Sequence, residues 1–158
     1  MKYGLKPVVY LTGSDKGNKE YIQRKVNEAG LQDQVVFTGF LSEEEMKYLY
    51  THASAMVYAS LMGPNNLPPI EATYLACPII ITNLQGHIEQ LEDAALYFDG
   101  YKPEELAHNM MRILTEPKLR ESLLGKEKIL TKKFEKVDYW SEIVKIFEEF
   151  EEVRRRWG

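Results

Sequence analysis

Five short apolar runs, separated by segments of helical periodicity, constrain the fold of this chain most. They span residues 7–12, 35–37, 55–59, 78–82 and 94–98. A strand that is buried on both faces is almost continuously apolar, whereas a half-exposed strand alternates apolar and polar residues. Strands that alternate with helices are joined by right-handed crossovers into a parallel sheet. The sequence therefore predicts an α/β fold, a Rossmann-like doubly wound parallel sheet, with residues 1–158 in a single domain.

The segments between the runs carry the signals of helix ends. Apolar residues of 18–29 fall on one side of a helix, which stops at Gly30. Ser42 and Glu45 have the spacing of a capping box, with Ser42 as the N-cap. Further helices are predicted from about residue 67, where prolines suit the first turn, over 104–114, and in two stretches that end with an apolar stripe over about 136–157.

The composition limits the partners and the chemistry. The chain has 20 Lys and Arg against 24 Asp and Glu, a formal net charge of −4. Nucleic-acid binding needs clustered cations, so this balance argues against a nucleic-acid partner. Cys77 is the only cysteine, which excludes an intrachain disulfide and a cysteine-based zinc site. His52 and His108 have no partners at metal-ligand spacing, so no metal site is predicted.

The hydropathy pattern argues against a membrane-spanning chain. No stretch reaches the roughly 18 apolar residues that a transmembrane helix needs. The start, residues 1–6, is too short and polar for a signal peptide. We therefore expect a soluble, cytoplasmic chain. The cations at 154–156 suit a helix C-terminus, and peripheral attachment to the inner face of a membrane is the weaker interpretation of them.

Ligands of open parallel sheets bind outside the carboxyl ends of the strands, so the loops that follow the strands are the segments to inspect. These loops are 13–17, 38–40, 60–69 and 83–89. The first is neither a Walker A motif nor a G-x-G-x-x-G fingerprint. The third places polar groups just before a predicted helix N-terminus, where N–H groups and the helix dipole favour a phosphate.

Glu71 lies about one turn into that predicted helix, which is otherwise apolar. Its carboxylate can accept two hydrogen bonds from a diol such as a ribose. It can equally do no more than complement the helix dipole in the first turn. The residues themselves leave these two interpretations balanced.

Four segments resemble, in order, consecutive signatures of one large family. They are residues 63–72, 75–80, 86–91 and 93–98. The family is the retaining glycosyltransferases with two Rossmann-like domains (the GT-B fold), known as glycosyl transferases group 1 or family 4. The resemblance covers nearly the whole chain and keeps the order and spacing of the C-terminal, donor-binding domain. Residues 35–40 also resemble that domain's second strand and base-binding turn.

The resemblance implies roles for particular residues. Glu71 corresponds to the second glutamate of the family's paired motif, which holds the donor ribose. The backbone at Asn66 and Leu67 lies where the phosphate or the donor sugar is contacted, and the backbone of Phe40 where the nucleobase is met. The remaining implied donor-binding positions are Gly13, Ser14, Gly63, Asn65, Gly86 and His87. For His87, a polar contact to the donor and a solvent-facing loop position both stay open.

The chain also departs from the family pattern. Gly63 stands where the first glutamate of the pair is expected, and Ala76 replaces a usual glycine, from which we expect slightly looser helix–strand contact. The Arg and Lys that clamp the diphosphate lie upstream of the first strand in the family, and Lys16 is no obvious substitute. The N-terminal acceptor domain is missing as well. We therefore expect weak nucleotide binding at most from this segment alone, and no transfer.

The sequence thus predicts the donor-binding domain of a glycosyltransferase that uses a nucleotide-diphosphate sugar with retention, in polysaccharide or cell-surface glycan synthesis. The family implies no cofactor and no metal, and a last helix at about 136–157 that packs on the missing domain. One alternative is a non-catalytic nucleotide- or sugar-binding module, or a subunit of a split transferase. Another is a different two-domain sugar enzyme, such as an epimerase.

Overall fold

The structure is a computed structural model that describes residues 5–63 and 66–157. The chain divides between Leu49 and Tyr50 into two compact units. The first unit holds the parallel strands β1 (Val9–Thr12) and β2 (Val35–Gly39), together with helix α1 (Lys19–Glu28) and the short 3-10 helix η1 (Gln32–Gln34). Helix α2 (Glu43–His52) carries the chain into the second unit.

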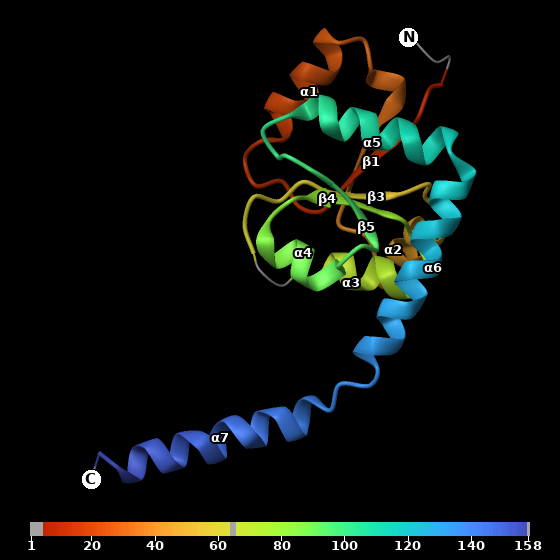
Figure 1. The fold of residues 1–158 in the computed structure, drawn as a ribbon. Coiled ribbons are helices and arrows are strands. Elements are labelled where there is room, and N and C mark those ends of the chain that lie inside the picture. Colours follow the sequence, from red (N-terminus) through yellow and green to blue (C-terminus); the bar gives the residue numbers. More distant parts are fainter. Residues whose placement is uncertain (1–4, 64–65, 158) are drawn as a thin grey trace. The chain divides into compact units, whose positions relative to one another are not determined.

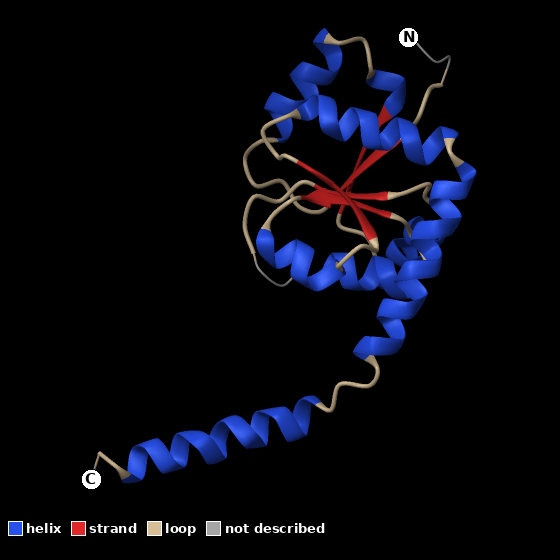
Figure 2. Ribbon diagram, in the orientation of Figure 1, coloured by secondary structure: helices blue, strands red, loops and turns tan. Residues whose placement is uncertain are grey.

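The second unit contains a three-stranded parallel sheet in the order β3 (Met56–Tyr58), β4 (Ile79–Thr82), β5 (Ala95–Phe98). All four residues of the central strand β4 are buried, as its continuous apolar run predicts. Helices α3 (Leu67–Tyr74) and α4 (Gln85–Leu91) lie on one face of this sheet, and α5 (Pro103–Thr115) lies on the other (Figures 1 and 2).

Helix α6 (Pro117–Phe134) packs against α3 and α5, and α7 (Tyr139–Arg155) is the last helix. The main apolar cluster of the second unit joins the sheet to α5 and α6 through Ile80, Phe98, Ile113 and Leu123. Parallel strands with helices on both faces confirm the predicted fold class. The single-domain boundary of 1–158 stays a prediction.

One predicted loop is wrong: helix α4 occupies most of the segment 83–89. This helix has seven residues, and only His87 and Leu91 are buried in it. Two buried positions in two turns are too few to produce a recognisable helical periodicity, especially when one of them is a histidine.

The predicted capping box at the start of α2 is confirmed. The backbone N–H of Ser42 donates to Glu45 Oε2 at 2.8 Å, and the N–H of Glu45 donates to Ser42 Oγ at 3.3 Å. These reciprocal bonds satisfy two N–H groups that the helix itself cannot. The bond from Ser42 also lowers the pKa of the Glu45 carboxyl.

The C-terminus of α3 explains the departure at Ala76. The N–H groups of Ala76 and Cys77 donate to the carbonyls of Thr73 and Ala72 at 3.3 and 3.0 Å, the pairing of a Schellman motif. Ala76 has a φ of +53°, in the left-handed region that this motif requires and that glycine adopts without cost. The alanine therefore brings local backbone strain, a consequence that the expectation of looser packing did not include.

A carboxyl group is buried on α6, close enough to Cys77 to affect its thiol. Glu127 is 1% exposed, and neither of its carboxylate oxygens has a hydrogen-bond partner within the described residues. Burial raises the pKa of Glu127 to about 8, and Arg120 opposes that shift. Burial, with a contribution from Glu127, raises the pKa of the buried Cys77 thiol to about 11. The Cys77 thiol is therefore uncharged at neutral pH, and the Glu127 carboxyl is mostly protonated there.

Helix α7 differs from α1 to α6 because it has no buried residue among those whose burial is described, and most of its apolar side chains are exposed. Trp140 is 74% exposed and Phe147 is 69% exposed. Also exposed are Tyr139, Ile143, Ile146, Phe150 and Val153 of α7, and Trp157 beyond its end. Within the described part of the chain, no helix is long and apolar enough to cross a membrane.

Candidate functional site

The carboxyl ends of β3 and β4 bring several of the predicted site residues together in the second unit. Strand β3 ends at Tyr58, and β4 ends at Thr82. Helix α3 begins after the first of these strand ends and α4 after the second (Figure 1). This is the edge at which open parallel sheets bind ligands, so side chains from both connections can meet there.

Asn66 is the N-cap of α3, but its side chain does not cap the helix. Its carboxamide Nδ2 donates to the carbonyl of Gly63 at 2.9 Å and lies 2.9 Å from His87 Nε2. Its Oδ1 accepts from the Tyr58 hydroxyl at 3.0 Å. Gln90 Nε2 donates to the Asn66 backbone carbonyl at 3.1 Å. The residue is therefore held at both its side chain and its backbone.

His87 is fully buried at 0% exposure, in helix α4. Its Nδ1 lies 3.0 Å from the carbonyl oxygen and 3.0 Å from the hydroxyl of Thr82. The Tyr58 ring packs edge-on to the imidazole, with centroids 5.9 Å apart. Both ring nitrogens thus have protein partners, and the solvent-facing position considered for His87 is wrong. Sequence spacing gave no indication of the Asn66–His87 contact, since the two residues are 21 positions apart.

Gly63 has a backbone conformation that a glutamate would not readily adopt. Its φ is +97°, and a Cβ built on it would lie 2.7 Å from Asn66 Oδ1. Both the left-handed backbone and the position of the Asn66 carboxamide favour glycine at this position. The absence of the first family glutamate is therefore consistent with the local structure of the loop.

Glu71 lies on α3 with an exposed side chain, and its carboxylate has a partner that the sequence did not reveal. The Tyr50 hydroxyl approaches Glu71 Oε2 at 3.3 Å and the Pro68 carbonyl at 3.5 Å. Burial, followed by the charge of Glu71, raises the pKa of Tyr50, so its hydroxyl stays a hydrogen-bond donor. Tyr50 thereby orients a carboxylate that remains accessible to a ligand.

The first turn of α3 offers fewer backbone donors than a helix N-terminus usually does. The helix begins Leu67-Pro68-Pro69, and proline has no N–H. Among the first three helical residues, only Leu67 therefore carries an N–H group. The expectation of a phosphate site built from several free N–H groups needs this correction: the helix dipole remains, but the directed hydrogen bonding is concentrated at Leu67.

The predicted positions in the first unit lie at the carboxyl ends of β1 and β2. The N–H of Gly13 donates to the carbonyl of Gly39 at 2.8 Å, which ties the two strand ends together. Ser14 follows Gly13, and Phe40 follows Gly39 with its side chain 82% exposed. Of the other predicted residues, Gly86 is in α4, and Asn65 lies outside the described residues.

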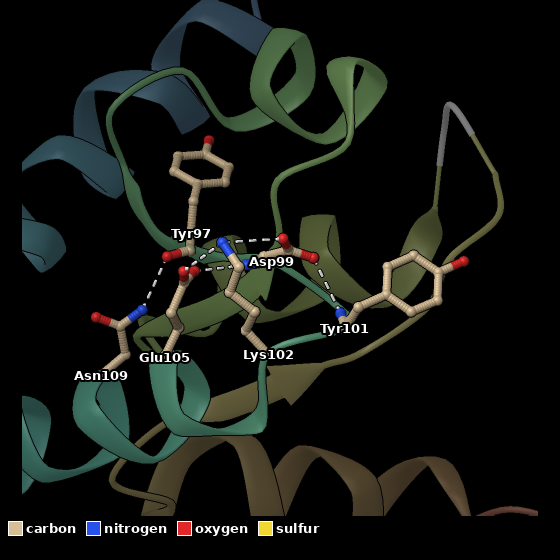
Figure 3. Close-up of polar contacts among 6 residues, drawn as sticks. All are labelled: Tyr97, Asp99, Tyr101, Lys102, Glu105 and Asn109. Atoms are coloured by element: carbon tan, nitrogen blue, oxygen red, sulfur yellow. Dashed lines mark hydrogen bonds and ion pairs between the residues drawn. The ribbon is translucent and has the colours of Figure 1, made fainter.

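The turn between β5 and α5 is also at the ligand-binding edge, but its polar groups pair with one another (Figure 3). Asp99 accepts from the N–H of Tyr101 at 3.0 Å, and Lys102 lies 3.3 Å from both Asp99 and Glu105. The backbone N–H of Asp99 also donates to Glu105 Oε2 at 2.9 Å. That bond, followed by the contact with Lys102, lowers the pKa of Glu105, and the bond from Tyr101, followed by Lys102, lowers the pKa of Asp99. The contacts with Glu105 and then Asp99 raise the pKa of Lys102. The polar groups of this turn are thus paired with one another at the start of α5. Among residues 5–63 and 66–157, no cluster of three or more His, Cys, Asp or Glu could hold a metal ion.

Comparison with known proteins places most of the chain in one family. The family model described as "Glycosyl transferases group 1" matches residues 4–128. The chain is 37% identical to the O-antigen chain mannosyltransferase RfbU of Salmonella typhimurium over 76 residues, which is 48% of this chain and 22% of that protein. It is 25% identical to the alpha-1,3/1,6-mannosyltransferase ALG2 of Dictyostelium discoideum, over 70% of this chain and 28% of that protein.

The fold is also similar to solved structures. Alr3699/HepE of Anabaena, in complex with UDP and glucose, superposes with a TM-score of 0.77 at 17% identity, over 90% of this chain and 40% of that one. The chain spans between 22% and 30% of the length of the curated relatives that it matches.

Proposed function

Because this chain belongs to the glycosyl transferases group 1 family, we propose that it is the donor-binding part of a retaining glycosyltransferase that uses a nucleotide-diphosphate sugar. The similarity to O-antigen mannosyltransferases supports a role in polysaccharide or cell-surface glycan synthesis. Alr3699/HepE has a similar fold, and its solved complexes with UDP and with UDP-glucose support a nucleotide sugar as the donor.

The observation that carries the proposal is the carboxylate of Glu71, exposed on α3 and oriented by Tyr50. An ionised carboxylate only accepts hydrogen bonds, and it can accept one from each of the two hydroxyls of a ribose. Glu71 is four residues from Leu67, about one helical turn, so an acceptor for a diol and a backbone donor for a phosphate share the start of one helix. A nucleoside diphosphate has both groups in one molecule.

The diphosphate becomes the leaving group when the sugar is transferred, and its developing charge must be stabilised. In this chain the dipole of α3 and the N–H of Leu67 supply part of that stabilisation. We propose that the remainder comes from cations upstream of β1, in a longer protein, and that no metal ion takes part. An acceptor domain in that longer protein would close the cleft over the donor, because transfer requires both substrates to be held together.

Calorimetric titration of the full-length protein with UDP, GDP and ADP tests this function. One nucleotide should bind, without metal and in the presence of EDTA, and Glu71→Ala should weaken that binding by about 1–3 kcal/mol through the loss of its hydrogen bonds. Glu121→Ala, which removes an exposed glutamate from α6, is the matched control and should leave binding unchanged. The absence of binding by all three nucleotides would refute the donor-site assignment. Binding without sugar transfer would favour a non-catalytic subunit.

A further inference from the structure

Two backbone carbonyls determine the hydrogen-bond polarity of the Asn66–His87 contact. The Thr82 carbonyl can only accept, so His87 Nδ1, 3.0 Å away, must carry a proton. The Gly63 carbonyl can likewise only accept, so the Asn66 group 2.9 Å away must be the NH₂. The arrangement that satisfies both has His87 Nε2 as an acceptor, and Asn66 Nδ2 then donates to it at 2.9 Å.

This polarity leaves the Asn66 carboxamide with one orientation. Nδ2 donates to Gly63 and His87, and Oδ1 accepts from Tyr58. A flipped amide would place its oxygen against the Gly63 carbonyl and the lone pair of His87 Nε2. Both contacts would then be repulsive, in a site where His87 is fully buried.

The orientation matters because Asn66 immediately precedes the backbone donor of α3. With prolines at positions 68 and 69, the N–H of Leu67 is the one directed donor among the first three helical residues. Its direction depends on the backbone of Asn66, which has extended angles (φ −114°, ψ 130°) that its side-chain bonds hold. A helix with several N–H groups in its first turn would still present a donor if one of them were misdirected. Helix α3 has only the N–H of Leu67 among its first three residues, so the direction of that group matters more.

We propose that His87 is a positioning residue of the donor site: it fixes the Asn66 carboxamide and, through it, the Leu67 N–H toward the donor diphosphate. This inference rests on the proposed donor-binding function. It also changes the expected role of His87, because a buried imidazole with both nitrogens engaged acts on the donor through Asn66 and makes no contact with it.

The geometry can be tested without any nucleotide. Long-range ¹H–¹⁵N correlation spectra of the imidazole should show His87 with its proton on Nδ1 and an unprotonated, hydrogen-bonded Nε2. Finding the proton on Nε2, or a rapid average of the two tautomers, would overturn the proposal whatever the protein binds.

The positioning role is tested by nucleotide affinity in the full-length protein. His87→Phe keeps a ring but removes the acceptor, and it should weaken binding about ten-fold, the effect of leaving one buried donor unpaired. His87→Gln, whose amide oxygen can take the place of Nε2, should recover most of that loss. A space-filling role alone predicts the opposite order, because phenylalanine fills the ring's space better than glutamine does.

Tyr58→Phe removes only the hydroxyl that holds Asn66 Oδ1 and should also weaken binding, so the proposal stays testable if His87→Phe does not fold. Tyr97→Phe is the matched control, since its hydroxyl donates to the Glu92 carbonyl, outside this network, and affinity should not change. Loss of binding in Glu71→Ala but in neither His87→Phe nor Tyr58→Phe would refute the positioning role and keep the proposed function. If the unsubstituted protein binds no nucleotide, the proposed function and the positioning role of His87 are both refuted.

Discussion

At the scale of single residues, Ala76 shows how one departure from a family pattern acquires a physical meaning. Glycine is favoured there because the Schellman motif at the end of α3 requires a left-handed residue, and Ala76 takes that conformation with φ +53°. An alanine in the left-handed conformation costs about 1–2 kcal/mol relative to glycine. Glycine would recover only a part of this, because it loses more conformational entropy than alanine when the chain folds.

Ala76→Gly should therefore stabilise the chain by about 0.5–1 kcal/mol, measured by urea unfolding. Ala107→Gly is the matched control, because it makes the same change at an exposed position inside helix α5 and should destabilise by about 1 kcal/mol. If both variants shifted stability in the same direction, the strain assigned to Ala76 would be disproved.

At the scale of elements, helix α6 contains the buried carboxyl of Glu127, whose pKa burial raises from 4.5 to about 8. Between these values the unfolded chain has lost this proton and the folded chain keeps it. The folded state then binds more protons, so stability falls as the pH rises through this window, by up to about 1.4 kcal/mol per pH unit. Cys77 stays protonated throughout this window, with a pKa of about 11.

Glu127→Gln has no proton to lose, so its unfolding free energy should depend less on pH than that of the unsubstituted chain between pH 5 and 8. The comparison is made by urea unfolding at several pH values, with Glu121→Gln, at an exposed position of α6, as the control. Equal pH slopes for the unsubstituted chain and Glu127→Gln would show that the carboxyl is already ionised in the folded state.

Elements also show which part of the structure the sequence could predict. The five apolar runs located every strand of the described residues, and Ser42 with Glu45 located the start of α2, because periodicity and capping are local properties. Helix α4 was missed because its signal is short. The Asn66–His87 and Tyr50–Glu71 contacts join positions 21 residues apart, and only the folded sheet brings them together. The resemblance located Glu71, whereas its orientation by Tyr50 required the structure.

At the scale of the whole molecule, helix α7 has an apolar stripe that the rest of this chain does not cover. An amphipathic helix is normally stable because its apolar stripe is buried, yet the side chains of Trp140, Phe147 and Phe150 are exposed. The relatives are three to five times longer than the matched segment, as their covered shares of 22–30% show. We therefore propose that α7 packs on the acceptor domain of the full-length protein, as the family resemblance implies.

Hydrogen exchange of the α7 amides tests this packing. In the 158-residue chain alone the exposed stripe should give little protection, whereas in the full-length protein the same amides should exchange much more slowly. Phe147→Asp should abolish that difference, because burying a phenylalanine contributes about 1.5–3 kcal/mol and a buried carboxylate opposes it. Glu148→Ala, on an exposed charged side chain of the same helix, should preserve the difference. Equal exchange in the two proteins would mean that the stripe has some other partner, and the acceptor-domain contact would have to be abandoned.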